Sequence, residues 1–276
     1  MGRTASVAPL SSTLDTQAEL WRTPMDDDKR SFWTSVPGIL TGLAAVIAAV
    51  STIYLGATRE NKGHGEVART PPLPSTVTSK PVAHTEWPSV GTETFTEGSS
   101  HWTVGSFSSE SERLDLRIVE GKYRWDLLSQ IPVTRSIEPQ YGSVVDFYAA
   151  VDARLVASTA KDPQISLQFG KASNKNYAFT IARHPTGMYF GLSRFDGTKP
   201  EELITWAHTP IKLEEVNRLA VLVENSTIKL FLNSSFVGDY RDPSFTGGKI
   251  GLAVTTFTGG SIVVDFDNFE LRRRPQ

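Results

Sequence analysis

The feature that most constrains the fold is an alternation of apolar and polar residues that recurs along the C-terminal two thirds of the chain. Apolar side chains occupy every second position in residues 145–155, 165–169 and 177–181. Successive side chains of a β-strand point to opposite faces, so each segment predicts a strand with one buried face. The pattern returns in residues 114–118, 123–127, 188–192, 228–232 and 250–254.

Turn residues separate these segments, among them His184-Pro185, Asn233-Ser234 and Gly259-Gly260. Roughly eleven or twelve short strands, without an amphipathic helix of convincing length, predict an all-β fold. We expect an antiparallel jelly-roll β-sandwich over residues 90–274. A barrel and a propeller are the alternatives, although no internal repeat has the period of a propeller blade.

The last strand contains one irregularity. Ile262, Val264 and Phe266 are apolar at even positions, whereas Phe269 and Leu271 continue at odd positions. A regular strand cannot place both sets in one core. The sequence therefore predicts a β-bulge at Asp267-Asn268.

A long uncharged stretch lies near the N-terminus, between Arg30 and Arg59. A helix over its residues 36–57 would rise about 33 Å, enough to cross a hydrocarbon core of about 30 Å. We therefore expect a single transmembrane helix at residues 35–58, preceded by a disordered tail at residues 1–34. A buried core helix and a cleaved signal peptide are the alternatives, but a signal peptide has an apolar region of only about 7–15 residues.

Two further features concern this anchor. Gly38 and Gly42 form a Gly-x-x-x-Gly step, which lets two membrane helices approach closely and predicts a homodimer. Small residues are also common in membrane helices in general, and that is the alternative. Residues 59–89 contain five prolines and predict an extended linker. We expect this linker to hold the sandwich away from the membrane, on its extracytoplasmic side.

Composition excludes several classes of function. The chain has 28 basic and 30 acidic residues, a formal charge of −2, so a nucleic-acid partner is not expected. It has no cysteine, which excludes disulfides, thiolate metal sites and cysteine nucleophiles. The five histidines are scattered and show no metal-ligand or triad spacing.

A set of motifs in the C-terminal part resembles a known family. In chain order they are ETFTEGSSHWTVG, EGKYRW, NYAFTIARHPTGMYF, NRLAVLVENSTIKLFLN, GKIGLAV and VDFDNFEL. They resemble the laminin-G-like jelly rolls of the concanavalin A-like lectin/glucanase superfamily, of the membrane-anchored bacterial type. The resemblance covers residues 90–272 and implies the fold more strongly than an activity, because the superfamily includes lectins, glycosidases and adhesion modules.

The resemblance also raises two kinds of site. Some glucanases of the superfamily carry a Glu-x-Asp-x-x-Glu strand with paired catalytic carboxylates, and Asp265, Asp267 and Glu270 give Asp-x-Asp-x-x-Glu. This motif begins with Asp and lies on the closing strand, so no catalytic residue is assigned. Related binding modules often hold a structural Ca²⁺, for which Asp267 with Glu97 or Glu93 would supply carboxylate ligands. No other cofactor is expected.

Sugar binding needs exposed aromatic rings beside polar side chains. Five residues alternate with apolar positions and are expected to line one face of a sheet: Tyr148, Arg154, Gln168, Tyr189 and Trp206. Trp206 is the main candidate, since it opposes Leu203 and Thr205 in a short strand. Packing of these rings inside the sandwich is the alternative.

These features together predict a membrane-anchored, non-catalytic module that binds carbohydrate or another surface ligand. Two alternatives stay open. One is a glycoside hydrolase that uses the closing carboxylates. The other is a structural or assembly subunit whose sandwich binds a protein.

Overall fold

The computed structural model describes residues 86–96 and 99–275, which form fifteen β-strands and no helix. The strands are β1 (Ser89–Glu93), β2 (Gly105–Ser108), β3 (Glu112–Val119), β4 (Lys122–Ser129), β5 (Val133–Ile137), β6 (Phe147–Ser158), β7 (Gln164–Ala172), β8 (Lys175–His184), β9 (Gly187–Phe195), β10 (Pro200–Thr209), β11 (Asn217–Glu224), β12 (Thr227–Leu232), β13 (Ser235–Arg241), β14 (Lys249–Thr256) and β15 (Gly260–Arg273).

In the described part of the chain, no helix is long and apolar enough to span a membrane. The predicted tail (residues 1–34), the predicted transmembrane helix (residues 35–58, with Gly38 and Gly42) and most of the predicted linker (residues 59–89) lie outside the described residues.

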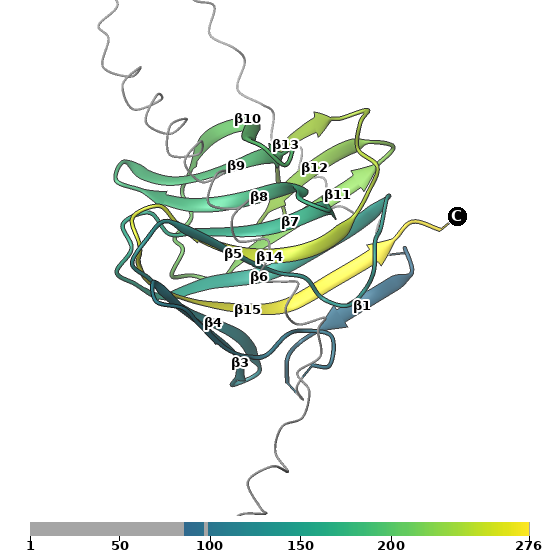
Figure 1. Cartoon of the computed structure of the whole chain (residues 1–276). Coiled ribbons are helices and arrows are strands. Elements are labelled where there is room, and N and C mark those ends of the chain that lie inside the picture. The colour runs from purple at the N-terminus through teal and green to yellow at the C-terminus, as the bar shows by residue number, and fades with distance from the viewer. Residues whose placement is uncertain (1–85, 97–98, 276) are drawn as a thin grey trace, which may run out of the picture. The chain divides into compact units, whose positions relative to one another are not determined.

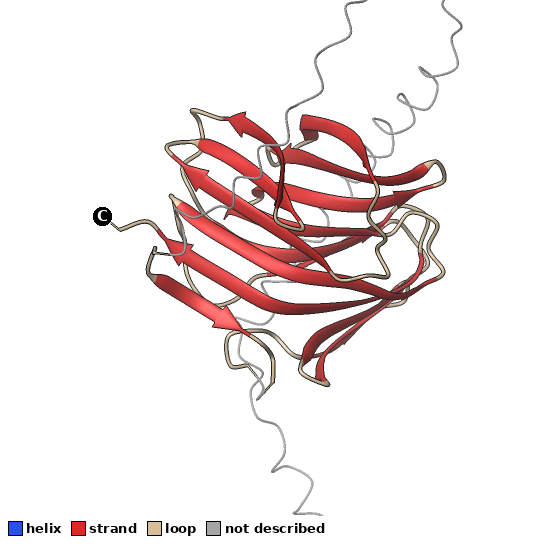
Figure 2. Ribbon diagram, turned by 180° about the vertical axis from the view of Figure 1, so that it is seen from behind, coloured by secondary structure: helices blue, strands red, loops and turns tan. Residues whose placement is uncertain are grey.

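The strands form two antiparallel sheets that stack face to face (Figures 1 and 2). The nine-stranded sheet has the order β13-β12-β11-β6-β15-β4-β3-β2, and β1 pairs with the C-terminal part of β15. The six-stranded sheet has the order β10-β9-β8-β7-β14-β5. The predicted antiparallel sandwich is confirmed. Short strands such as β1, β2 and β5 raise the number of strands above the predicted eleven or twelve.

The core lies between the sheets and is built from the alternating apolar positions. Leu167 of β7, Phe179 of β8 and Leu252 of β14 are completely buried, as the alternation predicts. One residue of the predicted apolar set is misplaced, because Val145 is 57% exposed. The strand begins two residues later, at Phe147, and Val145 lies in the preceding loop.

The predicted β-bulge in the closing strand is confirmed. Asp267 of β15 pairs with Asp152 of β6, but the next pair joins Glu270 to Ala150, so β15 contains one extra residue. Asn268 adopts the left-handed conformation, with a φ of 47°. The shift lets residues on both sides of the bulge reach the core, where Phe266 and Phe269 are 0% and 1% exposed.

Candidate functional site

The five predicted ligand-binding residues all point away from the main core, but they do not share one face. Tyr148 and Arg154 lie on β6 in the nine-stranded sheet. Gln168, Tyr189 and Trp206 lie on β7, β9 and β10 in the six-stranded sheet. The outer faces of the two sheets look in opposite directions, so the expectation of a single face is wrong.

The two residues of the nine-stranded sheet have partners within the protein. Tyr148 packs against a small apolar cluster formed by Trp87, Ala150, Leu222 and other residues outside the main core. Burial raises the pKa of its phenol, an effect that the charge of Arg218 opposes. Nη2 of Arg154 lies 3.3 Å from a carboxylate oxygen of Asp265.

Gln168 is also engaged, although it belongs to the six-stranded sheet. It is 6% exposed, and its Oε1 accepts a hydrogen bond of 2.7 Å from the Ser136 hydroxyl. It lies on β7, which β8 separates from β9. Tyr189 and Trp206 are therefore the two predicted residues that the structure brings together.

Trp206 lies on the outer face of the six-stranded sheet, against Gly191 of β9. A Cβ added to Gly191 would lie 3.2 Å from Cδ2 and Cε3 of the Trp206 ring. Phe190 and Leu192, on either side of Gly191, both point into the core, so Gly191 and the ring over it face outward. The indole is half-buried, and a glycine beneath it is what lets the ring approach the strand so closely.

The alternation that predicted this outward position does not hold along β10. Its register with β9 shifts twice, between Glu202 and Ile204 and again between Ile204 and Ala207. Because of these bulges, the side chains of neighbouring Leu203 and Ile204 both pack against the core. The outward position of Trp206 therefore depends on these bulges and not on a regular alternation along β10.

Two histidines that the sequence argument did not select flank Tyr189. His208 pairs directly with Tyr189 across β10 and β9, and the two rings meet edge to face at 5.6 Å. His184 contacts the ring of Tyr189 in the same way at 5.9 Å. His208 also lies over a glycine, since a Cβ on Gly187 would be 2.8 Å from its Nε2.

Tyr189, Trp206 and His208 thus share the outer face of β9 and β10, and these three residues are here called the aromatic strip. Each of its β10 rings, Trp206 and His208, lies over a glycine of β9. The sequence contained a signal for this arrangement: two glycines four residues apart in one strand, followed by Trp-x-His in the next. Reading it requires knowing that the two strands are neighbours.

A shallow depression lies beside the Trp206 ring, where the register between β9 and β10 shifts. Its lining consists of Thr180, Gly191, Leu192, Ser193, Glu202, Ile204 and Trp206. Glu202 pairs with Ser193 across the two strands, so both side chains stand on the outer face. Glu202 is exposed, and within residues 86–96 and 99–275 it has no ion-pair partner.

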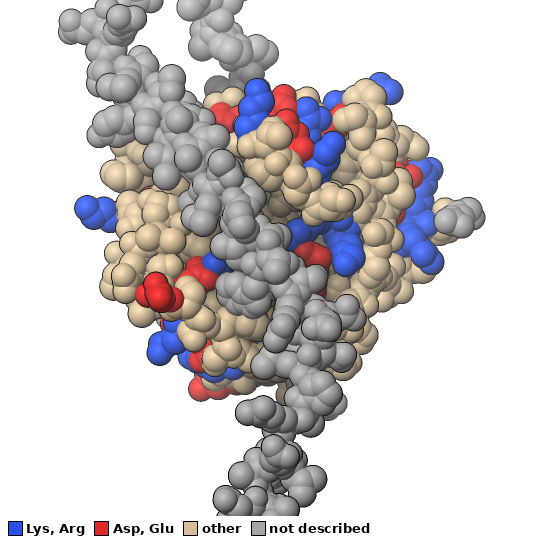
Figure 3. Space-filling model, in the orientation of Figure 1, with Lys and Arg blue, Asp and Glu red and all other residues tan. Residues whose placement is uncertain are grey.

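Next to the strip, the outer face of the six-stranded sheet is covered by small side chains. Thr180 of β8 lies opposite Gly191, and Ser166 of β7 lies opposite Thr180. The hydroxyls of Ser166 and Thr180 are 2.8 Å apart and hydrogen-bond to each other. Ala178, opposite Ser193, continues this small-residue floor. Figure 3 shows this side of the molecule, and on the coloured surface visible there the charged side chains lie in several separate groups.

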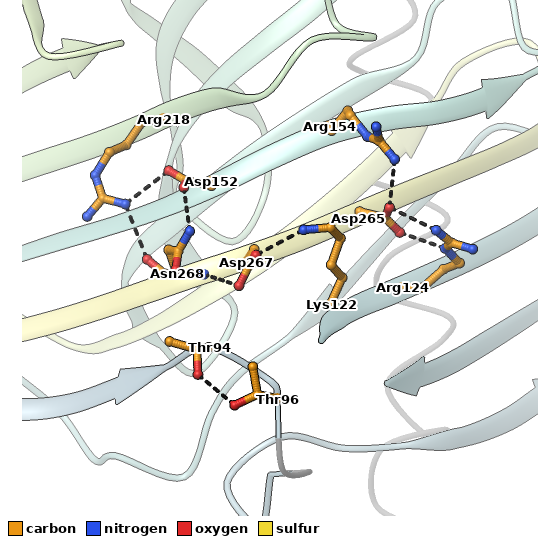
Figure 4. Close-up of polar contacts among 10 residues, drawn as sticks. All are labelled: Thr94, Thr96, Lys122, Arg124, Asp152, Arg154, Arg218, Asp265, Asp267 and Asn268. Atoms are coloured by element: carbon orange, nitrogen blue, oxygen red, sulfur yellow. Dashed lines mark hydrogen bonds and ion pairs between the residues drawn. The ribbon is translucent and has the colours of Figure 1, made fainter. Parts of the chain in front are cut away.

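The carboxylates of the closing strand lie on the other outer face. The bulge at Asn268 aligns Asp265, Asp267 and Glu270 on one side of β15. Each is already bound by cations. Arg124 holds Asp265 through two contacts of 2.6 and 2.9 Å, and Asp265 lies between Arg124 and Arg154 (Figure 4).

The other two carboxylates are bound in the same way. Asp267 accepts a hydrogen bond of 3.1 Å from Lys122, and Glu270 contacts Arg218 at 3.1 Å and Arg272 at 2.5 Å. A glycosidase needs one carboxyl that holds a proton and one free to act as base or nucleophile. On this face the three carboxylates form ion pairs within the sheet instead.

The proposed Ca²⁺ ligands are not assembled in the described part of the chain. One oxygen of Asp267 contacts Lys122 and the other accepts the backbone N–H of Asn268 at 2.7 Å. Glu93 accepts a hydrogen bond of 3.1 Å from the backbone N–H of Phe95, and Glu97 lies outside the described residues. Among the residues described, no three His, Asp or Glu side chains gather in a metal-binding arrangement.

No family model and no curated protein matches the sequence. Solved structures are similar in shape. One is described in connection with endo-acting O-glycanases that prominent members of the human gut microbiota express to initiate mucin breakdown. It has a TM-score of 0.50 and 9% sequence identity, over 68% of this chain and 100% of that one.

Two others have lower TM-scores. The carbohydrate-binding module CBM66 from Bacillus subtilis matches with a TM-score of 0.42 and 16% identity, over 67% of this chain and 94% of the module. The catalytic domain of an endo-1,3-beta-glucanase (laminarinase) from Thermotoga petrophila matches with a TM-score of 0.48 and 8% identity, over 69% and 99%.

The two antiparallel sheets and the likeness to the O-glycanase structure place the sandwich in the concanavalin A-like lectin/glucanase fold. The resemblance that the sequence motifs suggested is confirmed for the fold. Because one fold supports both binding and catalysis, function has to be argued from the residues on its surfaces.

Proposed function

We propose that this chain is a non-catalytic module that binds carbohydrate through the aromatic strip on the outer face of the six-stranded sheet. One observation carries the proposal: the Trp206 ring lies on the sheet surface over Gly191 instead of inside the sandwich. An indole left partly exposed forgoes up to about 2–3 kcal/mol of burial. A ligand that covers the ring recovers this energy.

The surroundings of the ring suit a sugar. Aromatic faces stack on the apolar faces of pyranose rings, and neighbouring polar groups bind the hydroxyls. Trp206 and Tyr189 supply the rings, and Glu202 and Ser193 supply hydrogen-bonding groups on the same face. The small-residue floor of β7 and β8 leaves room for further sugar units beside the strip.

We further propose that residues 35–58 anchor the module in a membrane and that the sandwich lies on the extracytoplasmic side. The support is the uncharged stretch of the sequence followed by a proline-rich segment. Protease added to intact cells should then degrade the sandwich, whereas full protection would reverse the orientation. An insertion of charged residues at Ala48 should release the protein from the membrane fraction.

A glycan array tests the binding proposal. The full chain in detergent should bind a subset of uncharged oligosaccharides, and Trp206→Ala should lower that binding at least about tenfold. Phe236→Ala is the matched control, because Phe236 is an aromatic residue that is 50% exposed on β13 of the other sheet. The control variant should bind like the wild type.

Three outcomes would contradict the proposal. Binding that is equal in wild type and Trp206→Ala would show that the ligand sits elsewhere. Absence of binding to any glycan would favour a structural subunit with a protein partner. Cleavage of a bound glycan, lost in Asp267→Asn, would establish the hydrolase alternative.

A further inference from the structure

Resting on the proposed function, we propose that the depression beside Trp206 selects an N-acetylated amino sugar. The acetamido methyl would enter the depression while the sugar ring stacks on Trp206. The depression has room for about one water molecule or methyl group, and its wall is mainly apolar. The Trp206 ring forms part of this wall, whereas the side chains of Leu192 and Ile204 pack toward the core. A whole sugar ring does not fit there, so the depression can only receive a substituent.

Glu202 is placed to recognise the amide of the same substituent. It stands on the rim of the depression, opposite Ser193, and is exposed. An ionised carboxylate only accepts hydrogen bonds, and in the described part of the chain no donor side chain satisfies it. The acetamido N–H is such a donor, and it lies on the atom next to the carbonyl carbon that carries the methyl.

The carbonyl oxygen of the acetamido group also has hydrogen-bond donors near it on the rim. This oxygen accepts hydrogen bonds, and Ser193 and Thr180 line the depression with hydroxyls. Ser193 has no hydrogen-bond partner among the described side chains, whereas Thr180 is engaged with Ser166. Ser193 is therefore the donor that is free to bind the carbonyl.

Other sugars fit this site less well. A hydroxyl at the same position would be taken from water into an apolar wall without a full set of partners, which is unfavourable. A uronic acid would bring a second negative charge next to Glu202, and like charges repel. A free amino sugar would satisfy Glu202 by charge but would leave the apolar depression empty.

Three trisaccharides that differ only at the 2-position separate these possibilities. They are the β1,4-linked trimers of N-acetylglucosamine, glucose and glucosamine, titrated calorimetrically into the full chain in detergent. The acetylated trimer should bind about tenfold more tightly than the glucose trimer, from one buried methyl and one charge-assisted hydrogen bond. Its affinity should change little with salt.

Variants assign the preference to the depression. Glu202→Ala should reduce the ratio of acetylated to glucose trimer to about threefold, and Glu202→Gln should lie between, because it keeps an acceptor. Ser193→Leu, which fills the depression, should remove the preference. Glu201→Gln is the control and should leave the ratio unchanged, because Glu201 pairs with Arg194 away from the depression.

The outcomes are distinguishable. Equal affinity for the acetylated and glucose trimers, with both lost in Trp206→Ala, would overturn this inference and leave the proposed function standing. Tightest binding of the glucosamine trimer, weakened by salt, would replace acetamido recognition by charge recognition. If none of the trimers or array glycans bound, the proposed function itself would fall.

Discussion

The two outer faces of the sandwich are built from different kinds of side chains. On the nine-stranded sheet, charged residues of neighbouring strands neutralise one another, as in the group formed by Arg124, Asp265 and Arg154. On the six-stranded sheet, small side chains of β7, β8 and β9 lie next to the aromatic strip of β9 and β10. Where charges are already paired, little is left for a ligand. Where a ring and a carboxylate have no internal partner, a ligand can supply one.

The largest expected effect concerns the paired face. Asp265 is 2% exposed, and its removal leaves two guanidinium groups without their shared partner. We expect Asp265→Ala to lower the free energy of unfolding by about 3 kcal/mol, as measured by urea denaturation. Asp239→Ala, on exposed β13 of the same sheet, should change it by less than about 0.5 kcal/mol.

A small effect of Asp265→Ala would change the comparison. It would mean that the paired charges of this face do not stabilise the fold. The face would then have to be considered as a binding surface in its own right, and the carboxylate motif of β15 would become the better candidate site.

A second prediction concerns the connection between the two sheets. Asp242, just after β13, accepts hydrogen bonds of 2.6 Å from both Tyr177 and Arg194 of the six-stranded sheet. Burial by itself would raise the pKa of Asp242, but hydrogen bonds from Ser244 and Tyr177 and the charge of Arg194 together lower it.

The sign of the pH dependence follows from that direction. A carboxyl whose pKa is lower in the folded than in the unfolded protein stabilises the fold above the unfolded value, about 3.9, and this stability is lost as the pH falls. We expect Asp242→Asn to flatten the decline of unfolding free energy below about pH 4. An unchanged decline would show that other carboxyls cause it.

At alkaline pH, the phenol of Tyr177, which donates a hydrogen bond to Asp242, also makes the stability depend on pH. Burial and the hydrogen bond with Asp242 raise the pKa of Tyr177 to about 12. The unfolded chain then loses this proton first, near pH 10, so stability falls as the pH rises from about 10 towards 12. Tyr177→Phe should remove this loss in a denaturation series, at the expense of one hydrogen bond at neutral pH.

The strands of this fold could be predicted from the sequence, but which strands are neighbours in a sheet could not. Alternation located the strands, and the change of parity between Phe266 and Phe269 located the bulge, because both rings must reach one core. Periodicity carries no information about strand order. Tyr148 and Tyr189 both alternate with apolar residues along their strands, yet they lie on the outer faces of different sheets.

The candidate site was therefore predictable only in part. An outward Trp206 was expected, but the ring depends on Gly191, a residue of another strand whose role appears only once β9 and β10 are paired. The bulges of β10 are also invisible in the sequence, and they decide both the outward position of the ring and the depression beside it.

A smaller change in stability is expected at Gly191 itself. In Gly191→Val the added methyl groups occupy the place of the indole, so the ring must leave the strand. Because the ring lies outside the core, we expect the unfolding free energy to change by about 1 kcal/mol. Glycan binding should nevertheless fall at least about tenfold in the array. Thr205→Val, an exposed neighbour of Trp206, serves as the control.

The smallest effect on stability is expected for Trp206→Ala. The prediction compares this tryptophan on the outer face with Trp125, a tryptophan in the core. Trp125 of β4 is 0% exposed between the sheets, and Trp125→Ala should cost about 3–5 kcal/mol through the cavity that it leaves. Trp206 is half-buried on the outer face, over a glycine, so Trp206→Ala should cost less than about 1 kcal/mol and lower the melting temperature by only a few degrees. Thermal unfolding of both variants beside the wild type measures the difference. A loss for Trp206→Ala that approaches the loss for Trp125→Ala would show that the ring stabilises the sandwich, and the energetic reason for assigning it to a ligand would then disappear.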